Sequence, residues 1–310
     1  MSSTDAIACA RDAFARSSRS LTVETDRALG PMTTYRVGGA SDLFVTCATA
    51  ADLDEVARVV ALSGIDALVI GNGSNLLVSE RGFRGIAIAL GEAFEFVVIV
   101  ANELRAGGAT RLPVAARRSA AAGLAGFEWA VGVPGTVGGA VRMNAGGHGS
   151  DIATTLLSAD IVDLRNGTHV TRPSTKLDLR YRHSNLASTD VVVEARFALA
   201  RGDSIRSEAE IAEIVRWRRE NQPGGQNAGS VFTNPAGDSA GRLIDSAGCK
   251  GLRIGGAHVS NKHANFFIAD EGGSADDVFA LMREVRRRVR DVHGVELTAE
   301  TKLVGFPEGL

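Results

Sequence analysis

The chain has 310 residues, of which 45% are hydrophobic and 23% are charged. This length and composition indicate a globular protein of two or perhaps three domains. The formal net charge of −2 excludes the strongly basic surface that attracts nucleic acid. Cys9, Cys47 and Cys249 are few and far apart and form no CxxC pair, so they indicate neither a metal site nor a disulfide framework. A reduced, cytoplasmic compartment fits this cysteine usage best.

No segment is predicted to target or anchor the chain. The first 19 residues lack the apolar core of a signal peptide, and the apolar run at residues 97–101 is too short to span a bilayer. Asn166 and Gly167, within a glycosylation-like triplet, are interpreted as a hairpin turn. We expect a monomer that acts on a small molecule, without nucleic acid or membrane as a partner.

The first predicted elements form a β-α-β unit. Residues 42–46 are predicted to be a strand, and the next helix has Thr49 as its N-cap and Gly64 as its stop. A second strand at residues 67–70 runs directly into a loop rich in glycine at residues 71–75.

Sequence periodicity predicts four elements in the middle of the chain and one turn between them. Strands are expected at residues 85–90, 97–105 and 190–200, and a helix is expected at residues 110–123. Residues 160–171 read as a hairpin folded at its Asn-Gly pair.

The pattern changes near residue 203, where a domain boundary is predicted. A highly charged helix is expected over residues 207–219, and a later helix begins with a capping box of Ser274 and Asp277 and ends at Gly294. A final strand is predicted from residue 295 to residue 306. The buried stripe predicted for the later helix consists of Val278, Leu281, Met282, Val285, Val289 and Val292.

Two loops rich in glycine carry the first functional signal. The first glycine loop, residues 71–76, follows a strand and has small residues whose N–H groups can point inward at an anion, with Ser74 and Asn75 as side-chain donors. It is not the dinucleotide fingerprint, because Leu76 occupies the last glycine position, and no P-loop lysine follows. A plain turn is an equally good interpretation of this loop alone.

The second glycine loop, residues 132–147, reads VPGTVGGAVRMNAG with one further glycine on each side, and contains Pro134 among its glycines. Glycine at this density permits unusual backbone conformations and close approach to a bulky anionic group. The loop lacks the Ser/Gly repetition of a flexible linker. We interpret it as a rigid cradle for a planar cofactor with phosphates, with a tight interior turn as the alternative.

Together with residues 33–39, TTYRVGG, the two loops resemble the UDP-N-acetylenolpyruvoylglucosamine reductases of peptidoglycan synthesis, from about Thr33 to Gly305. The resemblance implies an α+β protein with an FAD-binding fold of the vanillyl-alcohol-oxidase (PCMH) type in two subdomains, plus an α+β substrate-binding domain. It places the FAD-binding domain at residues 20–203, divided near residue 84, the substrate domain at 204–295 and a C-terminal strand at 296–310. The cofactor-binding residues it implies are Gly71, Asn72, Gly73, Ser74, Asn75, Leu76, Gly135, Thr136, Gly138, Gly139, Asn144, Gly146 and Arg182.

The same resemblance implies three catalytic residues. Arg182, in Tyr-Arg-His-Ser, matches the family's YRxS motif, and a guanidinium can clamp a carboxylate with two hydrogen bonds. Ser230, in NAGSVFTNP, matches the serine that delivers a proton, and Glu300 matches the glutamate that the family places opposite it. Without the resemblance, Arg182 would be interpreted as a surface arginine and Ser230 as a turn residue. Glu300 would be one of two nearby glutamates, the second being Glu296.

Asn234 and Lys262 match family positions near the substrate, although a solvated lysine is an equally good interpretation of Lys262. The short link between Ser184 and Val191 resembles the subgroup that lacks a tyrosine loop over the substrate. The group that holds the diphosphate is then open, with Arg216, Arg218, Arg219 and Arg242 as unranked candidates.

The resemblance implies a flavin enzyme with two half-reactions. NADPH reduces a non-covalent FAD, which then reduces the enolpyruvyl ether of UDP-N-acetylglucosamine to UDP-N-acetylmuramate. Arg182 and a protonated Glu300 would stabilise the developing negative charge, and Ser230 would supply the proton. The alternatives are an FAD-dependent oxidase of the same fold, with His148 as a possible tether, and a nucleotide-binding module without catalysis.

Overall fold

The structure is a computed structural model that describes residues 2–307, and it divides into two compact units. Unit 1 contains the described residues up to Asp26, Asp42–Asn72 and Arg84–Trp217, and unit 2 contains Arg27–Ser41, Gly73–Phe83 and the described residues from Arg218 onward. The boundary predicted near residue 203 lies at the start of α5 (Ser204–Asn221), whereas the two units divide within that helix. The predicted domain limits remain predictions.

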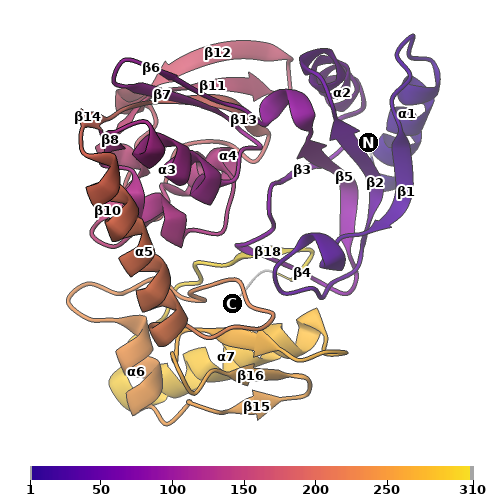
Figure 1. Ribbon diagram of the computed structural model, residues 1–310. Coiled ribbons are helices and arrows are strands. Elements are labelled where there is room, and N and C mark those ends of the chain that lie inside the picture. The colour runs from indigo at the N-terminus through magenta and orange to yellow at the C-terminus, as the bar shows by residue number, and fades with distance from the viewer. Residues whose placement is uncertain (1, 308–310) are drawn as a thin grey trace. The chain divides into compact units, whose positions relative to one another are not determined.

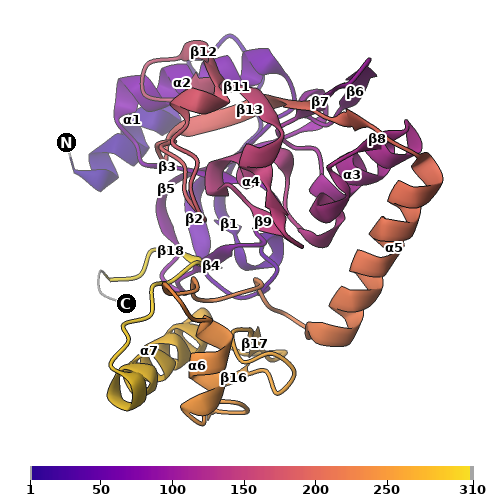
Figure 2. The ribbon, with the colours of Figure 1, turned by 90° about the vertical axis from the view of Figure 1, so that its left-hand side faces the viewer.

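A four-stranded sheet and two helices form the N-terminal part of the fold. Most of their residues belong to unit 1. The strand order is β1 (Val23–Ala28), β2 (Ala40–Cys47), β5 (Phe83–Leu90) and β3 (Ala67–Ile70), with β3 and β5 parallel. Helices α1 (Ser3–Ala15) and α2 (Ala50–Ser63) pack side by side beside it (Figures 1 and 2). The predicted β-α-β segment is present, but β5 lies between its two strands.

Local capping explains where α2 begins and ends. The Thr49 side chain accepts a hydrogen bond from the Asp52 N–H, and the Asp52 carboxylate accepts one from the Thr49 N–H. This reciprocal pair satisfies two N–H groups that the first helical turn leaves unpaired. Gly64 follows the helix in the left-handed conformation, so both predicted ends are confirmed.

The second sheet of unit 1 is antiparallel throughout. Its order is β12 (Thr168–Pro173), β11 (Leu156–Asp163), β13 (Asp190–Ala198), β7 (Glu103–Gly107) and β6 (Val97–Val100). The predicted hairpin at Asn166 is confirmed. The single strand predicted over residues 97–105 is wrong, because the chain turns at Ala101 and forms two strands.

Helices α3 (Leu112–Ala121) and α4 (Val137–Met143) pack beside this sheet (Figure 1). The helix predicted over residues 110–123 is therefore confirmed. Unit 1 also contains two short antiparallel pairs, β8 (Leu124–Ala125) with β14 (Ala200–Arg201) and β9 (Gly146–Gly147) with β10 (Ser150–Asp151). Its short 3-10 helices are Glu92–Phe94, Glu128–Gly132, Ile152–Thr154 and Ser174–Lys176, and Gly30–Met32 is a further one in unit 2.

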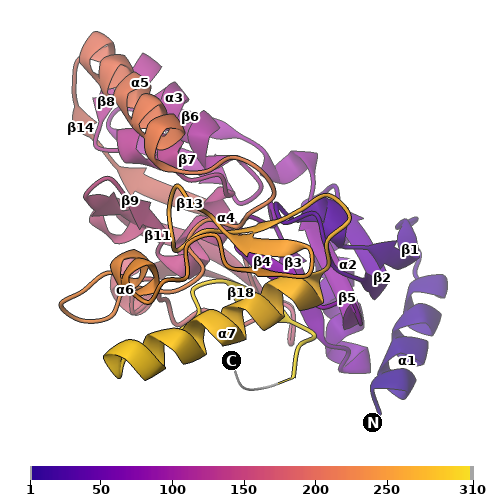
Figure 3. The same ribbon diagram turned by 90° about the horizontal axis from the view of Figure 1, so that it is seen from below.

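Unit 2 is built on α7 (Ala275–His293), which packs beside a three-stranded antiparallel sheet (Figure 3). The sheet contains β15 (Arg253–Ile254), β16 (Ala257–Val259) and β17 (Phe267–Ala269), and α6 (Ala240–Ser246) lies against the same helix. A separate parallel pair joins β4 (Leu76–Val78) to β18 (Lys302–Val304).

The capping box at Ser274 and the stop at Gly294 are confirmed for α7. Five residues of its predicted stripe are buried in the core of unit 2, but the prediction is wrong for Val292, whose side chain is 58% exposed. The final strand is shorter than predicted, because only Lys302–Val304 pairs with β4. No helix among residues 2–307 is long and apolar enough to cross a membrane.

Candidate functional site

In unit 1, the start of the first glycine loop, Gly71 and Asn72, lies next to the second glycine loop. The Asn72 side chain donates a hydrogen bond of 2.7 Å to the Pro134 carbonyl. A Cβ atom on Gly71 would lie only 2.5 Å from the Thr136 hydroxyl oxygen. An alanine at position 71 would therefore displace the Thr136 hydroxyl, which caps α4.

The start of α4 is fully hydrogen-bonded within unit 1. Thr136 caps the helix by accepting from the Gly139 N–H, while the N–H groups of Val137 and Gly138 donate to the carbonyls of Thr110 and Gly108. These backbone donors are therefore engaged already. The Gly135 carbonyl accepts from Leu112, which fixes the loop to α3.

The first glycine loop offers unused backbone donors. The N–H groups of Asn72, Gly73 and Ser74 have no intramolecular acceptor among the residues that the structure describes. Such N–H groups can bind the oxygens of a phosphate. At the end of the loop, Leu76 enters β4, and the Asn75 side chain donates to the Glu300 carbonyl at 3.1 Å. The loop residues thus fit a nucleotide cofactor.

Arg182 lies in a tight turn of unit 1, the Arg182 turn (residues 180–183). Arg180 and His183 exchange two backbone hydrogen bonds of 3.1 and 2.9 Å, and Arg182 has a positive φ of 55°. A positive φ is uncommon for an arginine and marks a conformation that its surroundings must hold. Its guanidinium donates to the Gly146 carbonyl of the second glycine loop at 3.0 Å.

Asn144 holds the Arg182 turn against the second glycine loop. Its side-chain nitrogen donates to the Arg180 carbonyl at 3.0 Å and to the Asp151 carboxylate at 3.1 Å. Its side-chain oxygen accepts from the Ala153 N–H at 2.9 Å, and only 1% of the residue is exposed. The amide is thus engaged within unit 1, so any contact with a cofactor would use the Asn144 backbone.

A second link joins α4 to the chain after the Arg182 turn. The Ser184 hydroxyl donates to the Arg142 carbonyl at 2.6 Å, and the Arg142 guanidinium donates to the Ala187 carbonyl at 2.5 Å. Burial lowers the pKa of Arg142. The serine of the YRxS motif therefore has a structural contact of its own in this chain.

Ser230 and Glu300 come together in unit 2, although they are far apart in the sequence. We call residues 230–233 the Ser230 segment. The Glu300 N–H donates to the Val231 carbonyl at 2.8 Å, and the Thr233 N–H donates to the Thr298 carbonyl at 2.9 Å. Gly229, with φ of 75° and no atom within 4 Å of an added Cβ, gives the chain before Ser230 its turn and an open face.

The sequence analysis missed Asn265, which contacts the Ser230 segment from the other side. Its side-chain oxygen accepts from the Phe232 N–H at 3.0 Å, and its side-chain nitrogen donates to the Phe232 carbonyl at 2.8 Å. The only signal for it in the sequence is a polar amide between the apolar residues Ala264 and Phe266.

The two predicted substrate residues also have contacts inside unit 2. The Asn234 side-chain oxygen accepts from the Ala240 N–H at the start of α6, and Lys262 donates to the Arg219 carbonyl near the end of α5 at 2.6 Å. The Asn234 side-chain nitrogen has no acceptor among residues 2–307. Next to Lys262, burial lowers the pKa of His263. Substrate contact by Asn234 and Lys262 stays a prediction.

The candidate diphosphate arginines differ in their surroundings. Burial lowers the pKa of Arg218, whose guanidinium donates to the Gln222 side chain at 2.8 Å. Arg242 forms an ion pair with Asp238. Among residues 2–307, the side chains of Arg216 and Arg219 form no hydrogen bond or ion pair that would favour one over the other. The competing glutamate, Glu296, lies 2.5 Å from Arg286 and is part of a different cluster.

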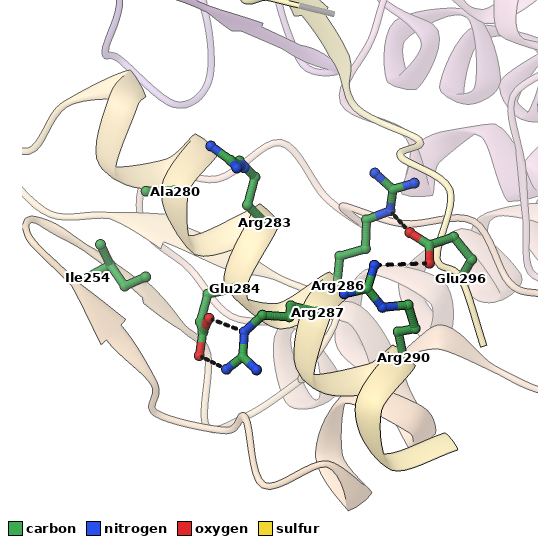
Figure 4. A pocket seen from close by; sticks show the side chains of 8 residues that line it. All are labelled: Ile254, Ala280, Arg283, Glu284, Arg286, Arg287, Arg290 and Glu296. Carbon is green, nitrogen blue, oxygen red and sulfur yellow. Dashed lines mark hydrogen bonds and ion pairs between the residues drawn. The ribbon is translucent and has the colours of Figure 1, made fainter. Parts of the chain in front are cut away.

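Figure 4 shows that cluster, a cavity of about 490 Å³ along one side of α7. None of the predicted catalytic, cofactor-binding or substrate-binding residues lines it. Its charges largely pair with one another, since Glu284 bonds Arg287 and Arg288 while Glu296 faces Arg286 and Arg290. The lining consists of Ile254, Ala280, Arg283, Glu284, Arg286, Arg287, Arg290 and Glu296. Within residues 2–307, no group of histidine, cysteine and acidic side chains is arranged to hold a metal.

Comparison with known proteins first defines the class. Residues 41–172 match the FAD binding domain family, and residues 221–304 match the C-terminal domain of UDP-N-acetylenolpyruvoylglucosamine reductase. Together with the adjacent glycine loops, these matches define an α+β flavoprotein with a PCMH-type FAD-binding domain and a separate C-terminal domain.

Full-length relatives then define the family. The chain is 43% identical to the UDP-N-acetylenolpyruvoylglucosamine reductase of Heliobacterium modesticaldum, over 89% of each chain, and 40% identical to that of Rubrobacter xylanophilus, over 91% of this chain and 95% of the relative. The crystal structure of the Thermus caldophilus reductase superposes with a TM-score of 0.80 at 32% identity, over 92% of this chain and 99% of that one. The chain belongs to this family of FAD-dependent oxidoreductases of peptidoglycan precursor synthesis.

Proposed function

We propose that this chain reduces the enolpyruvyl ether of UDP-N-acetylglucosamine with NADPH as the reductant, and that Arg182, Ser230 and Glu300 are its catalytic residues. Family membership supports the reaction. The observation that carries the residue assignment is the pairing of the Ser230 segment with the chain at Glu300, through the Val231 carbonyl. These backbone hydrogen bonds hold the two stretches of chain that carry Ser230 and Glu300 side by side, which supports a shared role.

Each catalytic residue has a separate task in this proposal. Arg182 orients the substrate carboxylate and balances the negative charge that develops on it, from a guanidinium that its bond to the Gly146 carbonyl holds in place. Ser230 gives a proton to the substrate carbon that becomes a carbanion. Its hydroxyl has no hydrogen-bond partner among residues 2–307, so it is available for this transfer. Glu300 donates a hydrogen bond to the same developing charge when it is protonated.

We also propose that FAD binds non-covalently to the two glycine loops. The unused N–H groups of Asn72, Gly73 and Ser74 would hold its phosphates, and residues 135–146 would support its ring. When bound, the flavin supplies hydride transfer between NADPH and the substrate. The task of the protein is to position the two reactants and to exclude water from the site.

The test uses purified protein with its bound flavin. We expect NADPH to bleach the flavin absorbance under anaerobic conditions, and the enolpyruvyl substrate to restore it with formation of UDP-N-acetylmuramate. Flavin that NADPH reduces but that only oxygen reoxidises would contradict the proposed reaction and favour an oxidase. A protein without flavin absorbance after loading with FAD would contradict the cofactor assignment.

Denaturation tests the mode of flavin attachment. We expect acid precipitation to release all the flavin into the supernatant. The nearest candidate tether in the second glycine loop region is His148, whose ring packs edge-on against Trp217 with centroids 5.1 Å apart. Colour that stays with the precipitate in the parent protein, but not in His148→Ala, would contradict non-covalent binding.

We further propose that the chain belongs to the subgroup without a tyrosine loop over the substrate. The connection from Ser184 to β13 consists only of residues 185–189, which leaves no room for such a loop there. One or more of Arg216, Arg218, Arg219 and Arg242 would then bind the diphosphate. When each is replaced by alanine in turn, the arginines that bind the diphosphate should be those whose loss raises the KM for the nucleotide substrate without changing the rate of flavin reduction by NADPH.

A further inference from the structure

A single buried side chain forms hydrogen bonds with both backbone polar groups of one residue, Phe232, two positions after Ser230. Asn265 is 2% exposed, and Phe232 is fully buried. The amide of Asn265 accepts from the Phe232 N–H and donates to the Phe232 carbonyl, so it pairs with that residue as a neighbouring strand would. The Asn265 backbone carbonyl also accepts from the Val231 N–H at 2.9 Å.

A side chain is needed here because the local backbone cannot continue the pairing. The chain turns sharply before Asn265, where the Phe266 N–H donates to the His263 carbonyl at 3.0 Å. Ser230 and Phe266 form one isolated antiparallel bridge, and residues 230–233 belong to no regular strand. Without the Asn265 amide, both polar groups of Phe232 that it engages would be buried and unpaired.

The opposite side of the Ser230 segment carries Glu300. Phe232 and Ala299 form a second isolated bridge, and the Val231 carbonyl accepts from Glu300. The segment is thus held between Asn265 on one side and the chain at Glu300 on the other. In the described part of the chain, the Asn265 side chain forms no hydrogen bond with the side chain of Ser230 or Glu300.

We propose that Asn265 is a positioning residue for proton delivery by Ser230. Its amide sets the height and direction of the Ser230 segment, and hence the place of the Ser230 hydroxyl relative to Glu300. This inference rests on the proposed role of Ser230. A displacement of about 1 Å at a reacting group can cost about 10²-fold in rate, which is the scale on which a positioning residue acts.

The variant Asn265→Leu keeps the approximate size of the side chain and removes both hydrogen bonds. We expect stopped-flow measurements to show reoxidation of reduced flavin by saturating substrate slowed by about 10- to 100-fold. Reduction of the flavin by NADPH should stay within about twofold of the parent, because that step needs no proton from Ser230. If Asn265→Leu does not fold, Asn265→Asp is measured instead, since it keeps the acceptor for the Phe232 N–H.

A double substitution separates positioning from general damage. In the Ser230→Ala background, replacing Asn265 should change the reoxidation rate less than twofold, because no hydroxyl remains to be positioned. Val285→Ala is the matched control, since it removes buried side-chain volume from the same core. It should lower the unfolding midpoint without slowing reoxidation selectively.

Three results would overturn the inference. Equal losses from the Asn265 substitution with and without Ser230 would show that Asn265 does not act through the hydroxyl. Equal slowing of both half-reactions, as in a generally damaged enzyme, would also contradict it. If Ser230→Ala alone reoxidises at the parental rate, the role of Ser230 itself fails, and that result is distinguishable because it does not involve Asn265.

Discussion

The Arg182 turn of unit 1 and the Ser230 segment of unit 2 are held in place in similar ways. Each has a buried asparagine whose side-chain amide bonds to backbone groups, Asn144 in the first case and Asn265 in the second. A primary amide suits this task because it carries a donor and an acceptor, like the peptide group it pairs with. Neither the Arg182 turn nor the Ser230 segment belongs to a regular sheet, whose hydrogen bonds would otherwise fix its position.

The two regions differ in what else their asparagine contacts. Asn144 joins three separate parts of unit 1, and the Arg182 guanidinium itself bonds to the second glycine loop. The Asn265 side chain engages a single residue, Phe232, which belongs to the Ser230 segment. Damage near Arg182 should therefore disturb cofactor binding as well as catalysis, whereas damage near Ser230 should disturb only the step that uses the substrate.

The largest expected effect is that of Ser230→Ala. Loss of a positioned proton donor typically costs about 10²–10⁴ in rate. We expect this loss in the reoxidation of flavin by substrate and no loss in its reduction by NADPH, both measured by stopped-flow absorbance. If flavin reduction and flavin reoxidation slowed by the same factor, the expectation that changes near Ser230 affect only the substrate step would be wrong.

Gly71→Ala should act on the cofactor instead. The new Cβ would lie 2.5 Å from the Thr136 hydroxyl and would displace it from its capping position at the start of α4. Overpacking of this kind costs about 1–3 kcal/mol, so we expect FAD affinity to fall by about tenfold or more in a fluorescence titration. Gly229→Ala is the matched control, since its position is open; it should strain a positive φ but leave FAD affinity unchanged. If Gly71→Ala kept the parental FAD affinity, the proposal that the two glycine loops bind FAD would be contradicted.

Asn144→Leu should have an intermediate effect on two properties at once. The Arg180 carbonyl and the Ala153 N–H would lose a partner, at a cost of roughly 2 kcal/mol or more in the free energy of unfolding. The Arg182 turn and the second glycine loop would both loosen, so FAD affinity and substrate reoxidation should fall together. If Asn144→Leu slowed reoxidation but kept the parental FAD affinity, as is predicted for Asn265→Leu, the proposed difference between the two asparagines would be wrong.

The smallest effect is expected at Glu284→Gln in the cavity of Figure 4. Hydrogen bonds from Arg287 and Arg288 lower the pKa of Glu284 to about 2, from a model-compound value of 4.5. A lowered carboxyl pKa adds stability that is fully present above about pH 4.5 and is lost as the pH falls toward 2. Because these groups are partly exposed, the substitution should cost less than about 1 kcal/mol at pH 7, and only a small part of that cost should remain near pH 2. A change in either half-reaction would show that this cavity takes part in the function.

The element pattern was largely readable from local sequence signals. Thr49, Ser274 and their partner aspartates mark helix starts, and Gly64 and Gly294 mark helix ends, because capping depends on residues within one turn. The errors lie where tertiary contacts decide. The turn at Ala101 has no glycine or proline to mark it, and the exposure of Val292 depends on where the core stops.

The sequence by itself determined the family, through motifs whose residue types and spacing suit a flavin and a carboxylate substrate, and it named the residues to examine. Only the tertiary structure decided which of those residues lie together. It joined Gly71 to Thr136, Arg182 to Gly146, and the Ser230 segment to the chain at Glu300. It also revealed Asn265 and the structural use of the Asn144 amide. A buried amide acts through hydrogen bonds to backbone groups that are distant in sequence, and a spacing pattern contains no information about such partners.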